Sequence, residues 1–203
     1  MGGLNMINSV LQNVTAYRLW QAPFAHTKFA PLLQHNDLRR IRHVLDVGCG
    51  PGTNAGQFTD CEYLGVDWNQ SYIDYASRRY GPRFIAANVL DYEPSANTLY
   101  DFILVNSFFH HIDDANTARV LTKLATLLAP EGHIHILDLV LPQNPSISRI
   151  LARLDRGQFA RPLEMWRRLF LEAFDPVVFE PHNMSYFGVT LWNMVYFKGK
   201  AHA

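Results

Sequence analysis

The sequence predicts an α/β fold in which helices cover both faces of a mostly parallel β-sheet. From Leu38 onward, short apolar segments alternate with segments of helical periodicity, an order typical of parallel strands joined by crossover helices. Near the end of the chain, two further apolar segments are too close together for such a helix. They therefore predict an antiparallel hairpin at the edge of the sheet.

Short segments rich in β-branched or aromatic side chains mark the strands. The first five are expected at 44–47, 63–66, 84–86, 101–105 and 133–140. The fourth, reading DFILV, is apolar enough to be buried on both faces. The hairpin strands are expected at 177–180 and 191–197, with a loop containing His182 to Gly188 between them. The expected sheet therefore has seven strands.

Segments of helical periodicity connect these strands. They are expected at 52–58, 70–80, 115–128, 147–154 and 162–174. Asp113 offers a capping carboxylate to the third helix, and Pro162 begins the last one. Before the sheet, residues 10–33 carry apolar side chains at helical spacings that Pro23 and Pro31 interrupt, which predicts short helices.

The stretch HVLDVGCGPG joins the first strand to a turn that is rich in glycine. Its glycines are Gly48, Gly50 and Gly52. A strand that runs into closely spaced glycines turns sharply and lets a ligand approach the bare backbone. The dinucleotide fingerprint needs Gly or Ala where Thr53 stands, and the Asp46 carboxylate just inside the turn would repel a pyrophosphate. These two positions disfavour a nicotinamide-dependent oxidoreductase and favour a cofactor with a cationic or amino group.

Polar side chains also follow the second, third and fourth strands. Asp67, at the end of the second strand, can accept both hydroxyls of a ribose or cap the next helix, and its place beside the glycine turn favours the ribose. Trp68 can lie flat on a purine ring. Asn88 and Asn106 follow the third and fourth strands, over the expected binding crevice.

These motifs in this order resemble the class I S-adenosylmethionine-dependent methyltransferases. The order is VLDVGCGPG, GVDWN, AANVLDY, DFILVNSFFHHI and LLAPEGHIHILD, over about His43 to Asp138. The resemblance implies a Rossmann-like three-layer αβα sandwich and S-adenosyl-L-methionine as cofactor, with S-adenosyl-L-homocysteine as product. It implies roles for nine residues: Asp46, Gly48, Gly50 and Gly52 at the methionine end, Asp67 on the ribose, Trp68 on the adenine, Asn88 and Val89 at the adenine edge, and Asn106 facing the amino group. Relatives usually carry Asp where Asn88 stands, and an amide oxygen can still meet the adenine amino group.

His110 and His111 are the candidates for a catalytic base, because they lie at the crevice and titrate near neutral pH. The alternative is that one or both pack structurally at the start of the next helix. Some quinone-pathway relatives bind a metal at this segment with two Glu and one His. The matching positions here, Ser107, His110 and His111, carry no carboxylate, so no metal is expected.

Residues outside the core are expected to recognise the methyl acceptor. The candidates are Tyr17, Trp20, Phe24, Arg156, Arg161, Trp166, His182 and Tyr186. The first three belong to an aromatic segment that is either a brace over the sheet or a lid over the ligand. Arg156 and Arg161 either clamp an anionic group or form an ion pair with Glu164, and the ion pair is favoured.

Composition limits the possible partners and the location. The 203 residues include 18 basic and 18 acidic side chains, so no overall charge attracts nucleic acid, and the many aromatics favour a small, partly apolar acceptor. Two cysteines, no secretion signal and no membrane span predict a cytoplasmic protein.

We expect one methyltransferase domain, 1–203, comprising a helical cap at 1–37, a cofactor-binding core at 38–141, a helical insert at 142–174 and a C-terminal hairpin at 175–203. The expected reaction is O-methylation of a small molecule; the alternatives are a non-methylating enzyme of the same fold, such as a cyclase, and a non-catalytic binding module.

Overall fold

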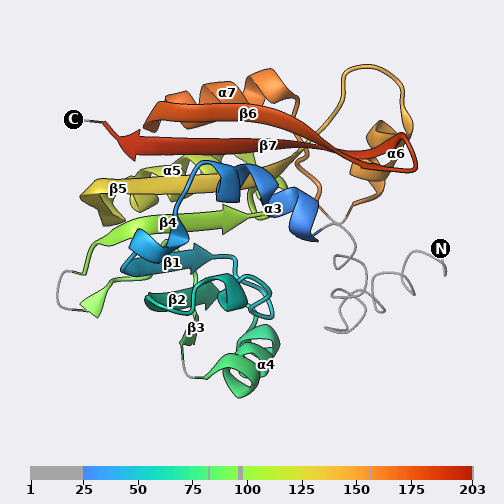
Figure 1. The fold of residues 1–203 in the computed structure, drawn as a ribbon. Helices are drawn as coiled ribbons and strands as arrows, with labels where there is room; N and C mark the ends of the chain where they lie inside the picture. The colour runs from blue at the N-terminus through green and yellow to red at the C-terminus, as the bar shows by residue number, and fades with distance from the viewer. Residues whose placement is uncertain (1–24, 82, 96–97, 156, 203) are drawn as a thin grey trace.

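The computed structural model describes residues 25–81, 83–95, 98–155 and 157–202. Its centre is a seven-stranded sheet in the order β3-β2-β1-β4-β5-β7-β6, with helices on both faces (Figure 1). The strands are β1 (His43–Val47), β2 (Glu62–Asp67), β3 (Phe84–Ala86), β4 (Tyr100–Asn106), β5 (Leu128–Val140), β6 (Phe174–Tyr186) and β7 (Val189–Ala201). The first five strands are parallel to one another, whereas β7 is antiparallel to both β5 and β6. The predicted αβα class and its antiparallel final hairpin are confirmed.

The hairpin is much longer than the sequence predicts. β6 and β7 have 13 residues each, and the segment from His182 to Tyr186 lies in β6 instead of a loop. Only Phe187 and Gly188, both with positive φ, form the turn. The prediction failed because Pro176 and Pro181 are typical of strand ends. They are tolerated inside β6 because β6 is an edge strand, where a missing N–H costs no ladder hydrogen bond.

The helices follow the predicted periodicity, with one exception. They are α3 (Ala25–Gln34), α4 (Gln70–Tyr80), α5 (Asp114–Leu127), α6 (Ile147–Leu154) and α7 (Leu163–Leu171). The helix predicted at 52–58 is wrong, since only the short 3-10 helix η2 (Ala55–Gln57) forms there. Gly52 still has a left-handed φ of 76° and β2 already begins at Glu62, which leaves too little chain for an α-helix followed by a turn.

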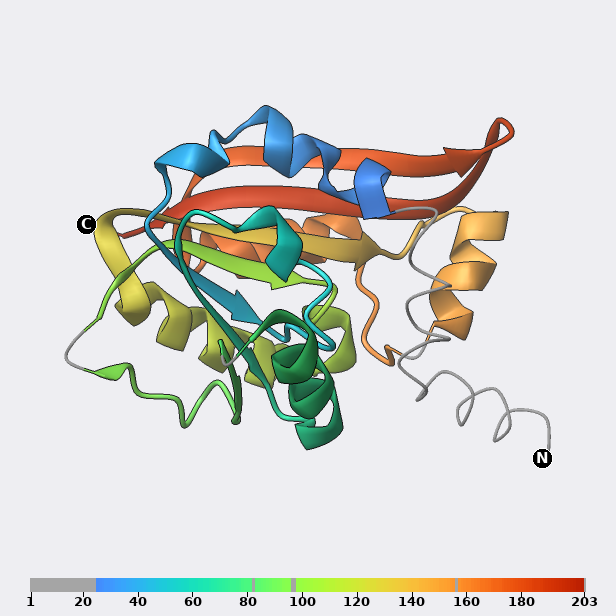
Figure 2. The same ribbon diagram turned by 60° about the horizontal axis from the view of Figure 1, so that its bottom comes forward.

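Two apolar layers hold the helices on the sheet. α5 and α7 pack on one face, where Leu121, Leu124 and Phe170 are completely buried. α3 and α4 pack on the other face through Leu32, Phe29, Ile73 and Ala76. Figure 2 shows α3 lying across β5 and β7, with α5 on the far side of the sheet. None of the helices in the described ranges is both long and apolar enough to cross a lipid bilayer.

Candidate functional site at the carboxyl edge of the sheet

The glycine turn leaves β1 at the carboxyl edge of the sheet, between β2 and β4. Gly48, Gly50 and Gly52 have φ angles of 67°, 54° and 76°, which explains why glycine stands at all three positions. The backbone N–H of Gly48 donates to the Val66 carbonyl over 2.8 Å. A Cβ on Gly48 would lie 2.5 Å from Cδ2 of Phe108, so the Phe108 ring closes one side of the turn.

Asp67 lies beside this turn, at the end of β2. One carboxylate oxygen accepts a hydrogen bond from the Gly50 N–H over 2.9 Å, and the other accepts from the Asn69 N–H over 2.8 Å. Burial raises the pKa of this carboxyl group, and the two hydrogen bonds oppose that rise. Each oxygen keeps a free lone pair, so the group can still accept two hydroxyl hydrogen bonds. Trp68, which follows it, is 82% exposed.

The floor of the turn is a buried polar network around Asp46. One oxygen of the fully buried carboxylate accepts from the Tyr63 hydroxyl over 2.6 Å and from Asn54 Nδ2 over 3.1 Å. Asn54 Oδ1 in turn accepts from Asn106 Nδ2 over 3.2 Å. Burial raises the pKa of Asp46 to about 7, against the effect of the hydrogen bonds from Tyr63 and Asn54.

Two acceptors of this network have no hydrogen-bond partner: Oδ1 of Asp46 and Oδ1 of Asn106, both buried. A buried acceptor without a donor is costly. Two of them at the base of one turn therefore fit a ligand with an amino group, as the sequence predicts for the methionine end of the cofactor.

Asn88 and Val89 follow β3 and line the same edge. The exposed Asn88 accepts a hydrogen bond from the Leu90 N–H through its own side-chain oxygen over 3.1 Å, which forms a local turn. The Val89 side chain is buried in the core. All nine residues predicted to bind the cofactor thus belong to β1 to β4 or to the segments that directly follow these strands.

His110 does not have the surroundings of a free base. Its Nδ1 lies 2.6 Å from Oδ1 of the fully buried Asp138, and its Nε2 lies 3.3 Å from Oδ1 of Asp155. Burial lowers the pKa of His110, but the two carboxylates outweigh burial and raise the pKa to about 9. His110 is therefore an imidazolium at neutral pH. It ties the 3-10 helix η4 (Phe109–His111) to β5 and to the segment that follows α6, and it cannot accept a further proton in that state.

His111 is the exposed neighbour of His110, and its ring centre lies 4.1 Å from that of His110. Ligand atoms of His110, His111 and Asp155 lie within 4.8 Å of one another. In the described structure, however, both ring nitrogens of His110 already face carboxylates. The expectation that no metal binds here stays a prediction.

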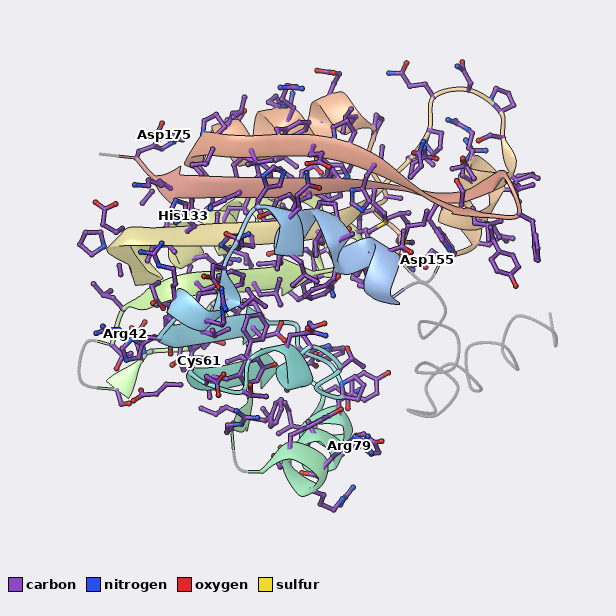
Figure 3. All side chains as sticks on the ribbon, viewed as in Figure 1. Arg42, Cys61, Arg79, His133, Asp155 and Asp175 are labelled. Atoms are coloured by element: carbon purple, nitrogen blue, oxygen red, sulfur yellow. The ribbon has the colours of Figure 1, made fainter. Side chains whose placement is uncertain are left out.

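Lys28 is a charged residue at this edge that was not among the predicted site residues. It belongs to α3, is only 5% exposed, and its Nζ donates to the Ser107 hydroxyl over 2.5 Å. Burial lowers the pKa of Lys28 to about 8, while Asp138 and Asp155 oppose that effect. Figure 3 shows Asp155 beside the amino-terminal end of α3. The only signal in the sequence was one lysine in an otherwise uncharged amphipathic helix.

The acceptor candidates are not brought together. Arg161 is buried, and it forms an ion pair with Asp114 over 2.6 Å; the predicted pairing with Glu164 is wrong, because Glu164 faces Arg167. Trp166 is completely buried and donates from Nε1 to the Leu139 carbonyl, so it lies in the core. Tyr186 is exposed at the hairpin tip, and His182 lies in β6 with both ring nitrogens buried. The remaining candidates, Tyr17, Trp20, Phe24 and Arg156, lie outside the described residues.

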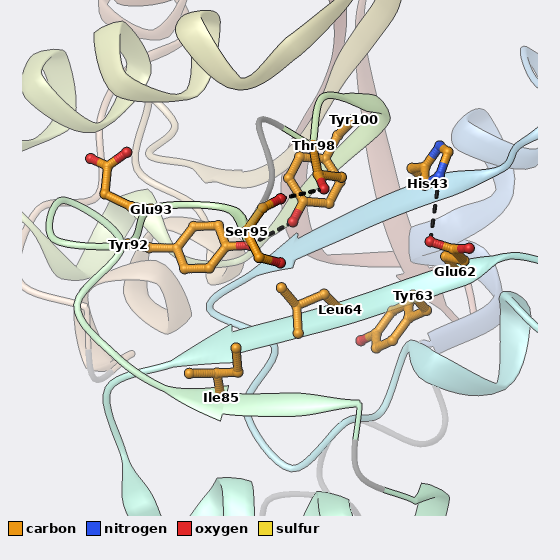
Figure 4. Close-up of a pocket in the computed structure, with 10 residues that line it drawn as sticks. All are labelled: His43, Glu62, Tyr63, Leu64, Ile85, Tyr92, Glu93, Ser95, Thr98 and Tyr100. Carbon is orange, nitrogen blue, oxygen red and sulfur yellow. Dashed lines mark hydrogen bonds and ion pairs between the residues drawn. The ribbon is translucent and has the colours of Figure 1, made fainter.

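A separate cavity of about 380 Å³ lies at the opposite, amino-terminal edge of the sheet (Figure 4). His43 and Glu62, at the starts of β1 and β2, form an ion pair on one side of it. Tyr92 and Tyr100 are joined by a hydrogen bond between their hydroxyls over 2.6 Å on the other side. None of the predicted site residues lines this cavity.

Comparisons with known proteins agree with this geometry. Residues 44–132 match the family model of a methyltransferase domain. The O-methyltransferase rstn1 of Aspergillus nomiae is 32% identical over 124 residues, which cover 56% of this chain and 54% of that protein. The trans-aconitate 2-methyltransferase of Methylobacterium radiotolerans is 32% identical over 121 residues, covering 57% of this chain and 44% of that protein. The chain thus spans about half the length of these curated relatives.

Among solved structures, the N-methyltransferase NodS from Bradyrhizobium japonicum, in complex with S-adenosyl-L-homocysteine, superposes with a TM-score of 0.74. The two chains are 17% identical, and each is covered to 98%. This likeness concerns the fold. Residues 44–132 thus match a methyltransferase domain, and the chain shares its fold with a solved S-adenosyl-L-homocysteine-bound methyltransferase.

Proposed function

We propose that this chain is an S-adenosylmethionine-dependent methyltransferase that methylates an oxygen atom of a small organic acceptor. The observation that carries the proposal is the turn after β1, where an aspartate and an asparagine leave two buried acceptors unpartnered beside left-handed glycines. O-methyltransferases among the relatives support oxygen as the methylated atom. We further propose that residues 1–203 act as one domain and that the protein is cytoplasmic.

In this proposal each part of the cofactor meets a different strand end. Asp46 and Asn106 face the amino group of the methionine moiety with their unpartnered oxygens. Asp67 accepts the ribose hydroxyls, and its hydrogen bond from Gly50 fixes it against the turn. Trp68 covers the adenine, whose edge meets Asn88 and the Val89 backbone.

The bound sulfonium supplies an activated methyl group, and the protein has to position the acceptor in line with it and exclude water. The partly buried Phe108, two residues after β4, supplies apolar surface there, and the completely buried Phe109 packs in the core beneath it. Because His110 is held as an imidazolium by two carboxylates, we assign it to positioning η4, and His111 stays the candidate for contact with the acceptor.

Calorimetric titration with S-adenosyl-L-homocysteine tests the proposal. We expect the wild-type protein to bind, and Asp67→Ala to weaken binding at least 10-fold, because charge-assisted hydrogen bonds are worth about 1.5–3 kcal/mol each. Asp74→Ala is the matched control, since Asp74 is an exposed carboxylate on α4 that bonds only to Gln70 among the described residues. Wild-type protein that binds neither the product nor the methyl donor would refute the function. Equal affinities for wild type and Asp67→Ala would refute the ribose contact alone.

A further inference from the structure

Lys28 is a buried cation whose hydrogen-bonding capacity is mostly unused. An ammonium group has three donors, and among the described residues Lys28 Nζ donates only to the Ser107 hydroxyl. Ser107 holds a left-handed φ of 54°, which is uncommon for serine, and its backbone N–H donates to the Leu137 carbonyl. A buried cation hydrogen-bonded to a neutral hydroxyl is costly unless an anion also binds there.

The carboxylates near Lys28 do not serve as its direct partners. Asp138 accepts hydrogen bonds from the Phe109 N–H, from its neighbour Leu139 and from His110 Nδ1. Asp155 pairs with His110 Nε2 and accepts from the Gly157 N–H. Neither lies within ion-pair distance of Lys28, although both act on it electrostatically. The direct ion-pair partner of these two carboxylates is therefore His110, and Lys28 acts on them only from a greater distance.

His182 is the second group at this place without a partner. It lies in β6 opposite Met194 of β7, on the face of the sheet that α3 covers. Both of its ring nitrogens are buried, and neither has a hydrogen-bond partner. Burial lowers the pKa of His182, the Glu180 backbone and carboxylate oppose that effect, and the charge of Lys28 adds to it. The neutral ring keeps one N–H that can donate.

We propose that Lys28, Ser107 and His182 form a binding site for an anionic oxygen of the methyl acceptor, which is a carboxylate or a phenolate. This inference rests on the proposed function and names the acceptor class. Lys28 of α3 contacts Ser107 directly after Asn106 of the cofactor site, and His182 lies in β6 on the face of the sheet that α3 covers. Stabilisation of an oxyanion by such donors is strongest in a buried site.

The reaction at this site balances without a base. The acceptor oxygen enters as an anion and attacks the methyl carbon; the carbon–sulfur bond breaks, and its electron pair stays on sulfur. The products are a methyl ester or an aryl methyl ether and S-adenosyl-L-homocysteine, and no proton has to leave. Lys28 keeps the acceptor oxygen deprotonated, which explains how the domain can work although His110 is already protonated.

The first test identifies the methylated atom. Wild-type protein is incubated with methyl-labelled S-adenosyl-L-methionine and a metabolite extract, and the labelled product is identified by mass. We expect a carboxylate or phenolic oxygen to carry the label; mild alkali releases labelled methanol from an ester but leaves an aryl ether intact, which separates the two sources. Label on nitrogen, carbon or an aliphatic hydroxyl would overturn this inference and leave methyl transfer standing. Absence of both label transfer and cofactor binding would instead refute the proposed function.

The second test uses the acceptor found in this way. Lys28→Met should raise its KM on the order of 10- to 100-fold, the range that corresponds to a lost charge-assisted hydrogen bond. Lys28→Arg should restore most of the affinity, and calorimetry should show unchanged binding of S-adenosyl-L-homocysteine by both variants. Lys198→Met is the matched control, because Lys198 reaches the far end of α3 through the His35 carbonyl. A Lys28→Met variant with wild-type KM and a lowered melting temperature would show that Lys28 only braces α3.

Discussion

Replacing His110 by asparagine should make the pH dependence of stability visible. Asparagine can keep a neutral donor near Asp138, but it removes the positive charge that faces Asp138 and Asp155. The change therefore isolates the charge of His110 from its packing and from its hydrogen bond. We expect the stability difference between wild type and His110→Asn to be largest at slightly acidic pH.

The size of this difference follows from the pKa of His110. The pKa is about 9 in the folded protein, against 6.5 for an ordinary histidine. A group whose pKa is raised by folding contributes stability that is fully present below the unfolded pKa and is lost as the pH rises through the folded one. The window is therefore 6.5 to about 9, and the loss across it is about 3 kcal/mol, since one pKa unit is worth about 1.4 kcal/mol.

Urea unfolding followed by circular dichroism measures this difference in parallel series from about pH 6 to about pH 9.5. The comparison has to be made at each pH, because Asp46 and Lys28, with pKa values of about 7 and about 8, also titrate in this range in both proteins. The difference between the unfolding free energies of wild type and His110→Asn should decrease by about 3 kcal/mol as the pH rises. A constant difference across the range would show that His110 is neutral in the folded protein, and it would restore His110 as a candidate base.

Two further predictions concern the glycine turn and the absence of a metal. Gly48→Ala should destabilise the protein on the order of 1–3 kcal/mol in the same unfolding assay, because the new Cβ would lie 2.5 Å from Phe108 at a left-handed φ. The same substitution should weaken S-adenosyl-L-homocysteine binding. Unchanged affinity would mean that the turn does not hold the cofactor. Methyl transfer should survive exhaustive chelation, because both ring nitrogens of His110 face carboxylates; loss of activity that added metal restores would assign His110, His111 and Asp155 as ligands.

The fold was largely predictable because its parallel half depends on local patterns. The helices at 70–80 and 147–154 and the strand at 84–86 begin and end as the periodicity indicates. The hairpin was underestimated because prolines end strands in general but are tolerated at a sheet edge, a property of the tertiary structure. The segment after Gly52 was misjudged for a related reason, since a left-handed glycine shortens the chain that is available for a helix.

The candidate site divides in the same way. Asp46 and Asp67 could be placed because each is fixed by its position after a strand, which periodicity predicts. Lys28 and His182 could not, because they reach the site from α3 and β6, more than 150 residues apart in the chain. Trp166 and Arg161 show the converse error: aromatic and cationic side chains in a helical insert indicated recognition, yet the fold uses both to hold α7 in the core.

The charges around His110 and Lys28 together limit the chemistry of the acceptor. Asp138 and Asp155 act on two cations, His110 and Lys28, and both carboxylates hold the closer cation, His110. A neutral acceptor that had to lose a proton would need a base here; His110, as a buried imidazolium, offers none at neutral pH, and the candidate that is left is His111. An acceptor that arrives as an anion needs only a donor, and Lys28 is the buried donor with unused capacity. The electrostatics of the edge therefore favour a carboxylate or a phenolate over an aliphatic alcohol, and the identity of the methylated atom decides between them.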